Sequence, residues 1–521
     1  MSTTEGLQGQ DDAKQAKTIA EDIQTLHSLG YAQELLRRMS GFSNFAISFS
    51  IICILAGGLT SFALGFSSVG GASIGIGWPI GAIMSFCFAM AMAQLASAFP
   101  TAGGLYHWAS ILGGRGLGWV TAWFNLVGLV TVLSAINVGT YQFTLGAFGA
   151  SLGIDAAKLD PTTAMIAQAV GVTLITVSQA IFNHRGIRVT TLLTDFSGYL
   201  IFVVSVVLTI ALFMSAEHLD LSRLWTFTNY TGDRGGGVWP ANGSMMYVFM
   251  LGLMLPAYTI TGFDASAHTS EETVGASRSV PKAILQAVVS SAILGWLMVS
   301  AIVLAAPTMD AAAGQGFNVV FSIFEVLPKS LRMILLGGIV IAQYLCGLAT
   351  VTSSSRMTYA FARDGGLPAS NKLKSVSAKF RTPAVAIWVV AILSTIFTVY
   401  TPVYSTITAV CVIFLYISYM IPIALGLVAY GRTWNQMGPW SIGGAYRPVA
   451  LICVLWCGAL FYIGVQPPND KALWITGGAI LVTSIVWFAY ERRHFVGPPR
   501  GVMSLEREAQ IAAAEKAVGE G

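Results

Sequence analysis

The sequence predicts an all-α membrane protein with twelve transmembrane helices. Of its 521 residues 55% are hydrophobic and only 10% are charged, whereas soluble domains carry roughly 25% charged residues. The apolar residues also gather in runs of about the 20 residues that a helix needs to cross a bilayer. Two of these runs, the first and the sixth, are interrupted by glycine and polar residues, which predicts helices that are broken inside the membrane.

The twelve apolar runs are separated mostly by short polar loops. They lie at about 44–66, 73–98, 117–147, 162–182, 190–214, 243–268, 282–306, 332–361, 383–400, 403–430, 447–466 and 471–490. Lys and Arg residues predict the orientation, because they are enriched in cytoplasmic loops. With the N-terminus inside, 22 of the 28 basic residues face the cytoplasm. We therefore expect a multi-pass protein of the cytoplasmic membrane with both termini in the cytoplasm.

The two interrupted runs divide the chain into repeats. The first run enters from the cytoplasm and the sixth from outside, so two five-helix units that begin with them would be inverted relative to each other, as in many secondary transporters. This predicts a cytoplasmic tail, two repeats, helices eleven and twelve, and a second cytoplasmic tail, at 1–40, 41–214, 243–430, 447–490 and 491–521. The first tail is polar, lacks a cleavable signal peptide, and is expected to end in a short amphipathic helix.

The two interruptions predict a binding site. An unpaired backbone group costs several kcal/mol in hydrocarbon, so a break persists only where protein or ligand satisfies it. In the first run, an unwound turn at ILAGGLTS (54–61) would expose amides that attract a carboxylate. In the sixth, carbonyls near Tyr258 to Thr261 would attract a cation. Together they could bind a zwitterion, although Gly57 and Gly58 alone would also fit close helix packing.

Several polar residues near the breaks have two readings each. Asp264 would either cap the helix that follows it or take part in proton coupling or gating. Phe263 would close over a substrate or pack in the core. Thr352 and Ser353 in the eighth run could ligate Na⁺, although hydrogen bonds between helices are the commoner use of such hydroxyls.

Four charged residues are predicted on the cytoplasmic face. They are Glu271, Glu272, Arg356 and Arg363. Ion pairs among them could close an inner gate. Solvent-exposed pairs are worth under about 1 kcal/mol, so orientation and solubility are the alternative reading.

Three motifs resemble one known family. They are GFDASAHTSEET with RSVPKAI, FPTAGGLYHWA, and SSSRMTYAFARDGGLP. These motifs are similar to those of the amino acid/choline transporter branch, which includes γ-aminobutyrate permeases, of the amino acid–polyamine–organocation (APC) superfamily. The likeness runs from about residue 30 to 490. It implies an APC fold, with substrate bound at the breaks of helices one and six. By position, the substrate-binding residues would be Gly57, Gly58, Leu59, Thr60, Ile260, Thr261, Gly262 and Phe263.

The expected function is secondary active transport of an amino acid or a γ-aminobutyrate-like zwitterion by alternating access. No cofactor is predicted, and the coupling ion stays open between proton and sodium, because the fifth run lacks the lysine that replaces sodium in some superfamily members. The oligomeric state also stays open. Nucleic acid is excluded as a partner, because the net charge of +4 is scattered.

The sequence bears on three other functions. An amine permease for choline or a polyamine would need aromatic faces or carboxylates in its cavity. Asp264 is a single candidate carboxylate, which is few for a polyamine. A nutrient sensor that does not transport remains an alternative, although the short tails leave no room for an ordinary signalling domain. An enzyme is not expected, because the histidines form no ligand pattern and all six cysteines lie in apolar runs.

Overall fold

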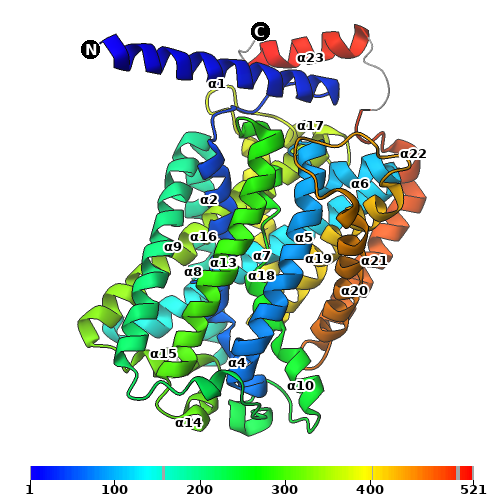
Figure 1. Ribbon diagram of the computed structural model, residues 1–521. Helices are drawn as coiled ribbons and strands as arrows, with labels where there is room; N and C mark the ends of the chain where they lie inside the picture. Colours follow the sequence, from blue (N-terminus) through cyan, green and yellow to red (C-terminus); the bar gives the residue numbers. More distant parts are fainter. Residues whose placement is uncertain (1, 155–158, 402, 500–504, 519–521) are drawn as a thin grey trace.

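The computed structural model is built from helices, and no strand occurs in residues 2–154, 159–401, 403–499 and 505–518, which are the residues it describes (Figure 1). Within these described residues, ten helical segments are long and apolar enough to cross a membrane. They are α2 with α3 (Gly41–Thr60), η1 with α5 (Ser73–Ala98), α7 (Arg115–Phe148), α8 (Pro161–His184), α9 (Ile187–Ser215), α13 (Ala276–Ala305), α16 (Lys329–Arg363), α19 (Tyr404–Ala429), η8 with α20 (Gly443–Gly464), and α21 with η9 and α22 (Asp470–His494). Two shorter apolar segments are α10 with α11 (Met245–Thr259) and α18 (Ala384–Tyr400). The prediction of an all-α membrane protein with twelve crossings is confirmed.

The first crossing is broken, as predicted. Its first helix, α2 (Gly41–Ile52), begins where the Ser40 hydroxyl accepts a hydrogen bond from the amide of Ser43 at 3.0 Å. The helix ends at Cys53, whose φ of +26° lies outside the helical region. Helical winding resumes in α3 (Gly57–Thr60) and continues in α4 (Phe62–Val69). Four residues in the middle of the crossing therefore leave the helix.

The sixth crossing is broken as well. Its first part, α10 (Met245–Gly252) and α11 (Met254–Thr259), ends at Ile260, which has φ −94° and ψ 62°. Gly262 then has φ +87°, a conformation that a residue with a side chain rarely adopts. Only short helices follow, α12 (Ala265–His268) and η6 (Ser270–Glu272). The second half of this crossing is thus mostly irregular.

Corresponding helices of the two predicted repeats pack against each other. The first and sixth crossings meet where α3 contacts α11, and the second and seventh where α5 contacts α13. The same pairing joins α7 with α16 and α8 with α18. Contact between each helix and the helix five crossings later is the arrangement expected of two units related by a pseudo-two-fold axis.

Both ends of the described chain lie at the same end of the bundle, which we call the terminal face (Figure 1). There α1 (Ser2–Ser28) lies across the bundle beside α23 (Leu505–Val518). The expectation of a short helix at the end of the N-terminal tail is wrong. The tail begins with a long helix, and residues 29–39 are irregular because their backbone bonds to other elements. Two further short helices between crossings are α6 (Leu105–Gly113) and α17 (Ser370–Leu373), whereas α14 (Met309–Gly314) and α15 (Val319–Phe324) lie at the opposite face.

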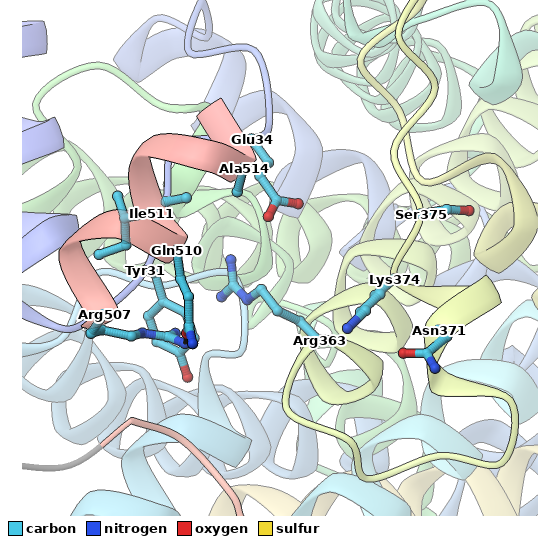
Figure 2. A pocket seen from close by; sticks show the side chains of 11 residues that line it. Tyr31, Glu34, Arg363, Asn371, Lys374, Ser375, Arg507, Gln510, Ile511 and Ala514 are labelled. Carbon is cyan, nitrogen blue, oxygen red and sulfur yellow. Dashed lines mark hydrogen bonds between the residues drawn. The ribbon is translucent and has the colours of Figure 1, made fainter. Parts of the chain in front are cut away.

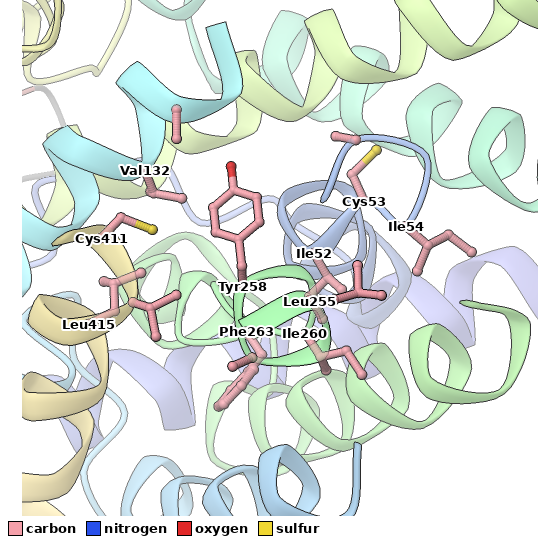
Figure 3. Close-up of a cluster of buried hydrophobic side chains, with 14 of the residues drawn as sticks. Ile52, Cys53, Ile54, Val132, Leu255, Tyr258, Ile260, Phe263, Cys411 and Leu415 are labelled. Atoms are coloured by element: carbon pink, nitrogen blue, oxygen red, sulfur yellow. The ribbon is translucent and has the colours of Figure 1, made fainter. Parts of the chain in front are cut away.

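The two breaks lie inside the apolar core. Figure 3 shows side chains from both breaks together with side chains of α7 and α19. Ile52, Cys53 and Ile54 come from the first crossing, and Tyr258 and Phe263 from the sixth. At this depth the backbone groups that leave the helix must be satisfied by neighbouring protein groups, by water in a cavity or by a bound solute.

Candidate functional site

The first break presents free amides. The amides of Gly57 and Thr60 donate to the carbonyls of Cys53 and Ala56 at 3.0 and 2.9 Å. Between them, the amides of Gly58 and Leu59 donate to no described residue. Free amides at the start of a helical turn favour a negatively charged group, so this turn can bind a carboxylate without a charged side chain.

The sixth crossing presents free carbonyls beside those amides. The carbonyls of Tyr258 and Thr259 accept no hydrogen bond from the described residues. A Cβ atom added to Gly57 would lie 2.9 Å from the Cα atom of Thr259, so the two breaks are in contact there. Carbonyls at a helix end attract cations. Unpaired amides and unpaired carbonyls therefore lie on two neighbouring segments.

The site is enclosed by aromatic side chains. On one side the hydroxyls of Thr60 and Tyr404 are 2.6 Å apart, and the rings of Tyr258 and Tyr404 meet edge to face. On the other side Phe263 is fully buried and its ring lies 5.3 Å from that of Tyr419. Phe263 is thus part of the packed core in this conformation.

The other residues of the sixth break are held by α5 and α19. Ser85 donates to the carbonyl of Ile260 at 3.0 Å. The amide of Gly262 donates to the Tyr419 hydroxyl at 3.2 Å, and Thr261 lies 3.5 Å from the same oxygen. The three residues between the free carbonyls and Phe263 are therefore oriented by their neighbours.

Asp264 does not cap the helix that follows it. Although it precedes α12, its carboxylate accepts no bond from the α12 amides. Instead Oδ1 accepts from the Tyr419 hydroxyl at 2.7 Å, and Oδ2 lies 3.2 Å from both Nδ2 of Asn125 and Nε2 of His268. The capping interpretation was wrong, because partners from three other positions occupy both oxygens.

The four charged residues form two ion pairs, which we call the double ion pair. Arg356 binds both oxygens of Glu272 at 2.9 Å, and Arg363 binds both oxygens of Glu271 at 2.9 Å. Glu271, Glu272 and Arg356 are 0% exposed, so the interpretation of these pairs as exposed surface charges is wrong. Pairs of this kind differ from surface pairs, because removing one partner leaves a buried charge uncompensated.

Residues 29–39 cover the double ion pair. The amides of Arg38 and Met39 donate to the carbonyl of Glu272 at 2.9 and 2.7 Å, and the Gln33 side chain donates to the carbonyl of Glu271 at 2.9 Å. Arg363 also stacks on the ring of Tyr31, with its guanidinium carbon 3.9 Å from the ring centre. The N-terminal segment therefore closes the terminal face over these charges.

A cavity of about 390 Å³ lies outside this cover, between α23 and the end of α16 (Figure 2). It is lined by Tyr31, Glu34 and Arg363 on the bundle side and by Arg507 on α23. Behind it, Asp364 accepts hydrogen bonds from the hydroxyls of Tyr31 and Tyr106, both at 2.8 Å. Burial raises the pKa of Asp364, and the charge of Arg363 acts in the opposite direction.

The two hydroxyls considered for Na⁺ have different surroundings. Thr352 donates to Oδ1 of Asn183 on α8 at 2.7 Å, which is an interhelical bond. The Ser353 hydroxyl is buried and has no hydrogen-bond partner among the described residues. Only Ser353 therefore presents an unused oxygen.

Comparison with known proteins identifies the family. The family model described as amino acid permease matches residues 39–490. The chain belongs to this family. The permease is 32% identical over 512 residues to "Amino-acid permease BAT1" of Arabidopsis thaliana, which covers 92% of this chain and 96% of the relative. It is similar at 32% identity to the rice homologue, covering 91% and 94%, and at 27% to "Amino-acid permease 2" of Neurospora crassa, covering 91% and 88%. The predicted resemblance to the APC superfamily is confirmed, and the protein is a transporter for amino acids rather than an enzyme.

Some residues around the permease site were not predicted. Tyr419 and Asn125 reach Asp264 from α19 and α7, and nothing in the sequence near Asp264 indicates them. His268 carried a local signal, because it lies four residues after Asp264 in the motif GFDASAHTSEET, and residues at this spacing share a helix face.

Proposed function

We propose that this permease moves a zwitterionic amino acid, or a γ-aminobutyrate-like relative, across the cytoplasmic membrane by alternating access. The observation that supports this most is that the turn with the free amides of Gly58 and Leu59 packs against the helix end with the free carbonyls of Tyr258 and Thr259. In the proposal the substrate carboxylate binds the amides and the substrate ammonium binds the carbonyls. The remaining residues proposed to line the substrate are Gly57, Thr60, Ile260, Thr261, Gly262 and Phe263.

We further propose that the terminal face is cytoplasmic and that the double ion pair is the inner gate. The Lys and Arg distribution supports this orientation, since the sequence assigns 22 of the 28 to the side of the two termini. Opening toward the cytoplasm would then require the two Glu–Arg pairs to separate and residues 29–39 to move. An epitope tag at the N-terminus should be inaccessible to external antibody in intact cells and become accessible on permeabilisation.

Uptake into proteoliposomes tests the transport proposal. The purified protein should take up labelled amino acids or γ-aminobutyrate saturably, with choline and polyamines as competitors of the alternative class. Gly58→Trp should abolish this uptake, because the side chain of residue 58 points at Met298 and Val299 inside the core. Gly477→Trp is the matched control, since a Cβ atom at Gly477 meets no atom within 4 Å. No saturable uptake of any amino acid, or stronger uptake of choline or a polyamine, would contradict the proposal.

A further inference from the structure

We infer that Asp264 and His268 together bind one exchangeable proton, and that this is the proton the permease cotransports with its substrate. The inference rests on the proposed transport function and adds to it the coupling ion and the residues that carry it. Both side chains are 0% exposed, and intramembrane carboxylates and imidazoles commonly serve in proton pathways.

The partners of His268 fix the number of protons. Its Nδ1 lies 3.1 Å from the carbonyl oxygen of Ala102. A carbonyl can only accept a hydrogen bond, so Nδ1 carries a hydrogen atom. Nε2 lies 3.2 Å from Oδ2 of Asp264. A neutral His268 beside an ionised Asp264 would place two lone pairs face to face without water, so a further proton must lie on Nε2 or on Oδ2.

The other hydrogen-bond partners of the Asp264 carboxylate do not supply the proton between Oδ2 and Nε2. The Tyr419 hydroxyl donates to Oδ1 at 2.7 Å, and Asn125 approaches Oδ2 at 3.2 Å. Both are neutral hydrogen-bond donors, and neither lies between Oδ2 and Nε2. With the shared proton the Asp264–His268 pair has no net charge, and without it the pair is a buried anion.

Among the described residues, the other charged groups near the Asp264–His268 pair are either exposed or already paired. Among the elements packed against α12, α2 contains no charged residue and the basic residues of α13 are exposed. On η6 and α16, Glu271 and Glu272 are neutralised by Arg363 and Arg356. Tyr419 of α19 is the titratable group in direct contact, and His107 of α6 is bonded to Thr101 at 2.8 Å.

The position of the pair couples it to both ends of the transport path. On the substrate side, the Tyr419 hydroxyl that binds Asp264 also accepts from the amide of Gly262. On the terminal side, the carbonyl of Ala102 bonds to His268 while the amide of Ala102 donates to Oε1 of Glu271 at 3.0 Å. Loss of the proton would make Asp264 and His268 repel, and a movement of His268 would be transmitted through Ala102 to Glu271 of the double ion pair.

The proposed transport cycle takes up one proton and releases one proton for each substrate. The pair takes up a proton when the path is open to the opposite face, and substrate binds at the breaks. When the double ion pair opens, water reaches the Asp264–His268 pair and the proton leaves to the terminal side with the substrate. One proton and one substrate move in the same direction, and no bond other than those to the proton is made or broken.

Proton-driven accumulation and substrate exchange, both measured in proteoliposomes, separate a role of His268 in proton coupling from a role in folding. An inward proton gradient of one pH unit should drive wild-type accumulation of a zwitterion up to about tenfold, the limit for one proton per substrate. In His268→Gln, which cannot bind the proton, accumulation should fall to onefold. Exchange of internal for external substrate should persist in this variant, because exchange needs no proton release. His184→Gln, a partly buried histidine on α8 outside this network, should behave as wild type.

The outcomes are distinguishable. If the wild type exchanges substrate but only a sodium gradient drives accumulation, or if His268→Gln accumulates substrate as the wild type does, this inference is wrong and the proposed function stands. If the wild type neither exchanges nor accumulates any amino acid, the proposed function fails and the inference with it. Should His268→Gln not fold, Asp264→Asn makes the same comparison, and substrate-evoked proton entry into wild-type vesicles, read with an internal pH dye, must be seen in either case.

Discussion

The Glu272–Arg356 pair, in which both side chains are fully buried, gives the sharpest prediction. Glu272→Gln removes the negative charge but keeps the size of the side chain, so the guanidinium of Arg356 remains at 0% exposure without a counter-charge. Removing one partner of a buried ion pair typically costs about 3–5 kcal/mol. At about 1.4 kcal/mol per factor of ten, the closed conformation would lose between about 140-fold and 3,700-fold in population relative to conformations in which water reaches Arg356.

The six cysteines provide the assay, because all of them are buried and unfolding exposes them together to a thiol-reactive fluorescent dye. Glu272→Gln should melt well below the wild type. Arg234→Gln is the control, since the Arg234–Asp310 pair at 3.2 Å has side chains 62% and 76% exposed and should contribute under about 1 kcal/mol.

A double variant tests the reason for the loss. Glu272→Gln with Arg356→Gln removes both charges, and it should recover part of the lost stability because no uncompensated charge remains. Equal melting of Glu272→Gln and Arg234→Gln, or a double variant less stable than the single one, would refute the argument from burial.

Three further predictions follow from the structure. Gly57→Ala should reduce the initial uptake rate by about 5-fold to 140-fold, since its Cβ atom would lie 2.9 Å from the backbone of Thr259 and such overpacking costs about 1–3 kcal/mol. Gly58→Ala, which meets the flexible end of Met298 at 3.4 Å, should stay within about twofold, and equal loss in both variants would contradict this. Burial, with the charge of Arg363, lowers the pKa of His107 to about 3, so the unfolded chain binds a proton below about pH 6.5 that the folded chain does not. Stability should therefore fall as the pH drops from about 6.5 toward 3, by up to about 1.4 kcal/mol per pH unit, and melting curves of His107→Gln should lack this share of the slope. Arg507→Ala removes two hydrogen bonds to the carbonyl of Gly30, at 2.9 and 2.6 Å, and should speed hydrogen–deuterium exchange in residues 30–39, whereas exposed Lys516→Ala should not.

The features that could be predicted from sequence are those with local causes. The twelve crossings follow from apolar runs, and the two breaks follow from glycine and polar residues that no lipid-facing helix would contain. The break near Gly57 and Gly58 and the one near Gly262 both occur where the sequence indicated them. The end of the sixth apolar run is more irregular than expected, since only four residues of α12 are helical there.

Partners that are distant in the sequence could not be predicted. For Asp264 the sequence left a helix cap and a coupling or gating role open. Its partners Tyr419 and Asn125 are more than a hundred residues away, and no local pattern indicates them. The double ion pair was treated as a surface feature, because its burial depends on residues 29–39 folding over it. That segment is irregular, and its path depends on the groups of the bundle that it covers, which its own sequence does not indicate.

The short helix α18 has a consequence for the surrounding lipid. At 17 residues and 1.5 Å per residue it is about 26 Å long, while the hydrocarbon of a typical bilayer is about 30 Å thick. Its flank exposes Ile392, Ile396 and Val399, so acyl chains must lie against it. The bilayer beside this helix has to thin by about 4 Å, or the whole bundle has to lean, and either response makes the energy of the embedded protein depend on the thickness of the membrane that holds it.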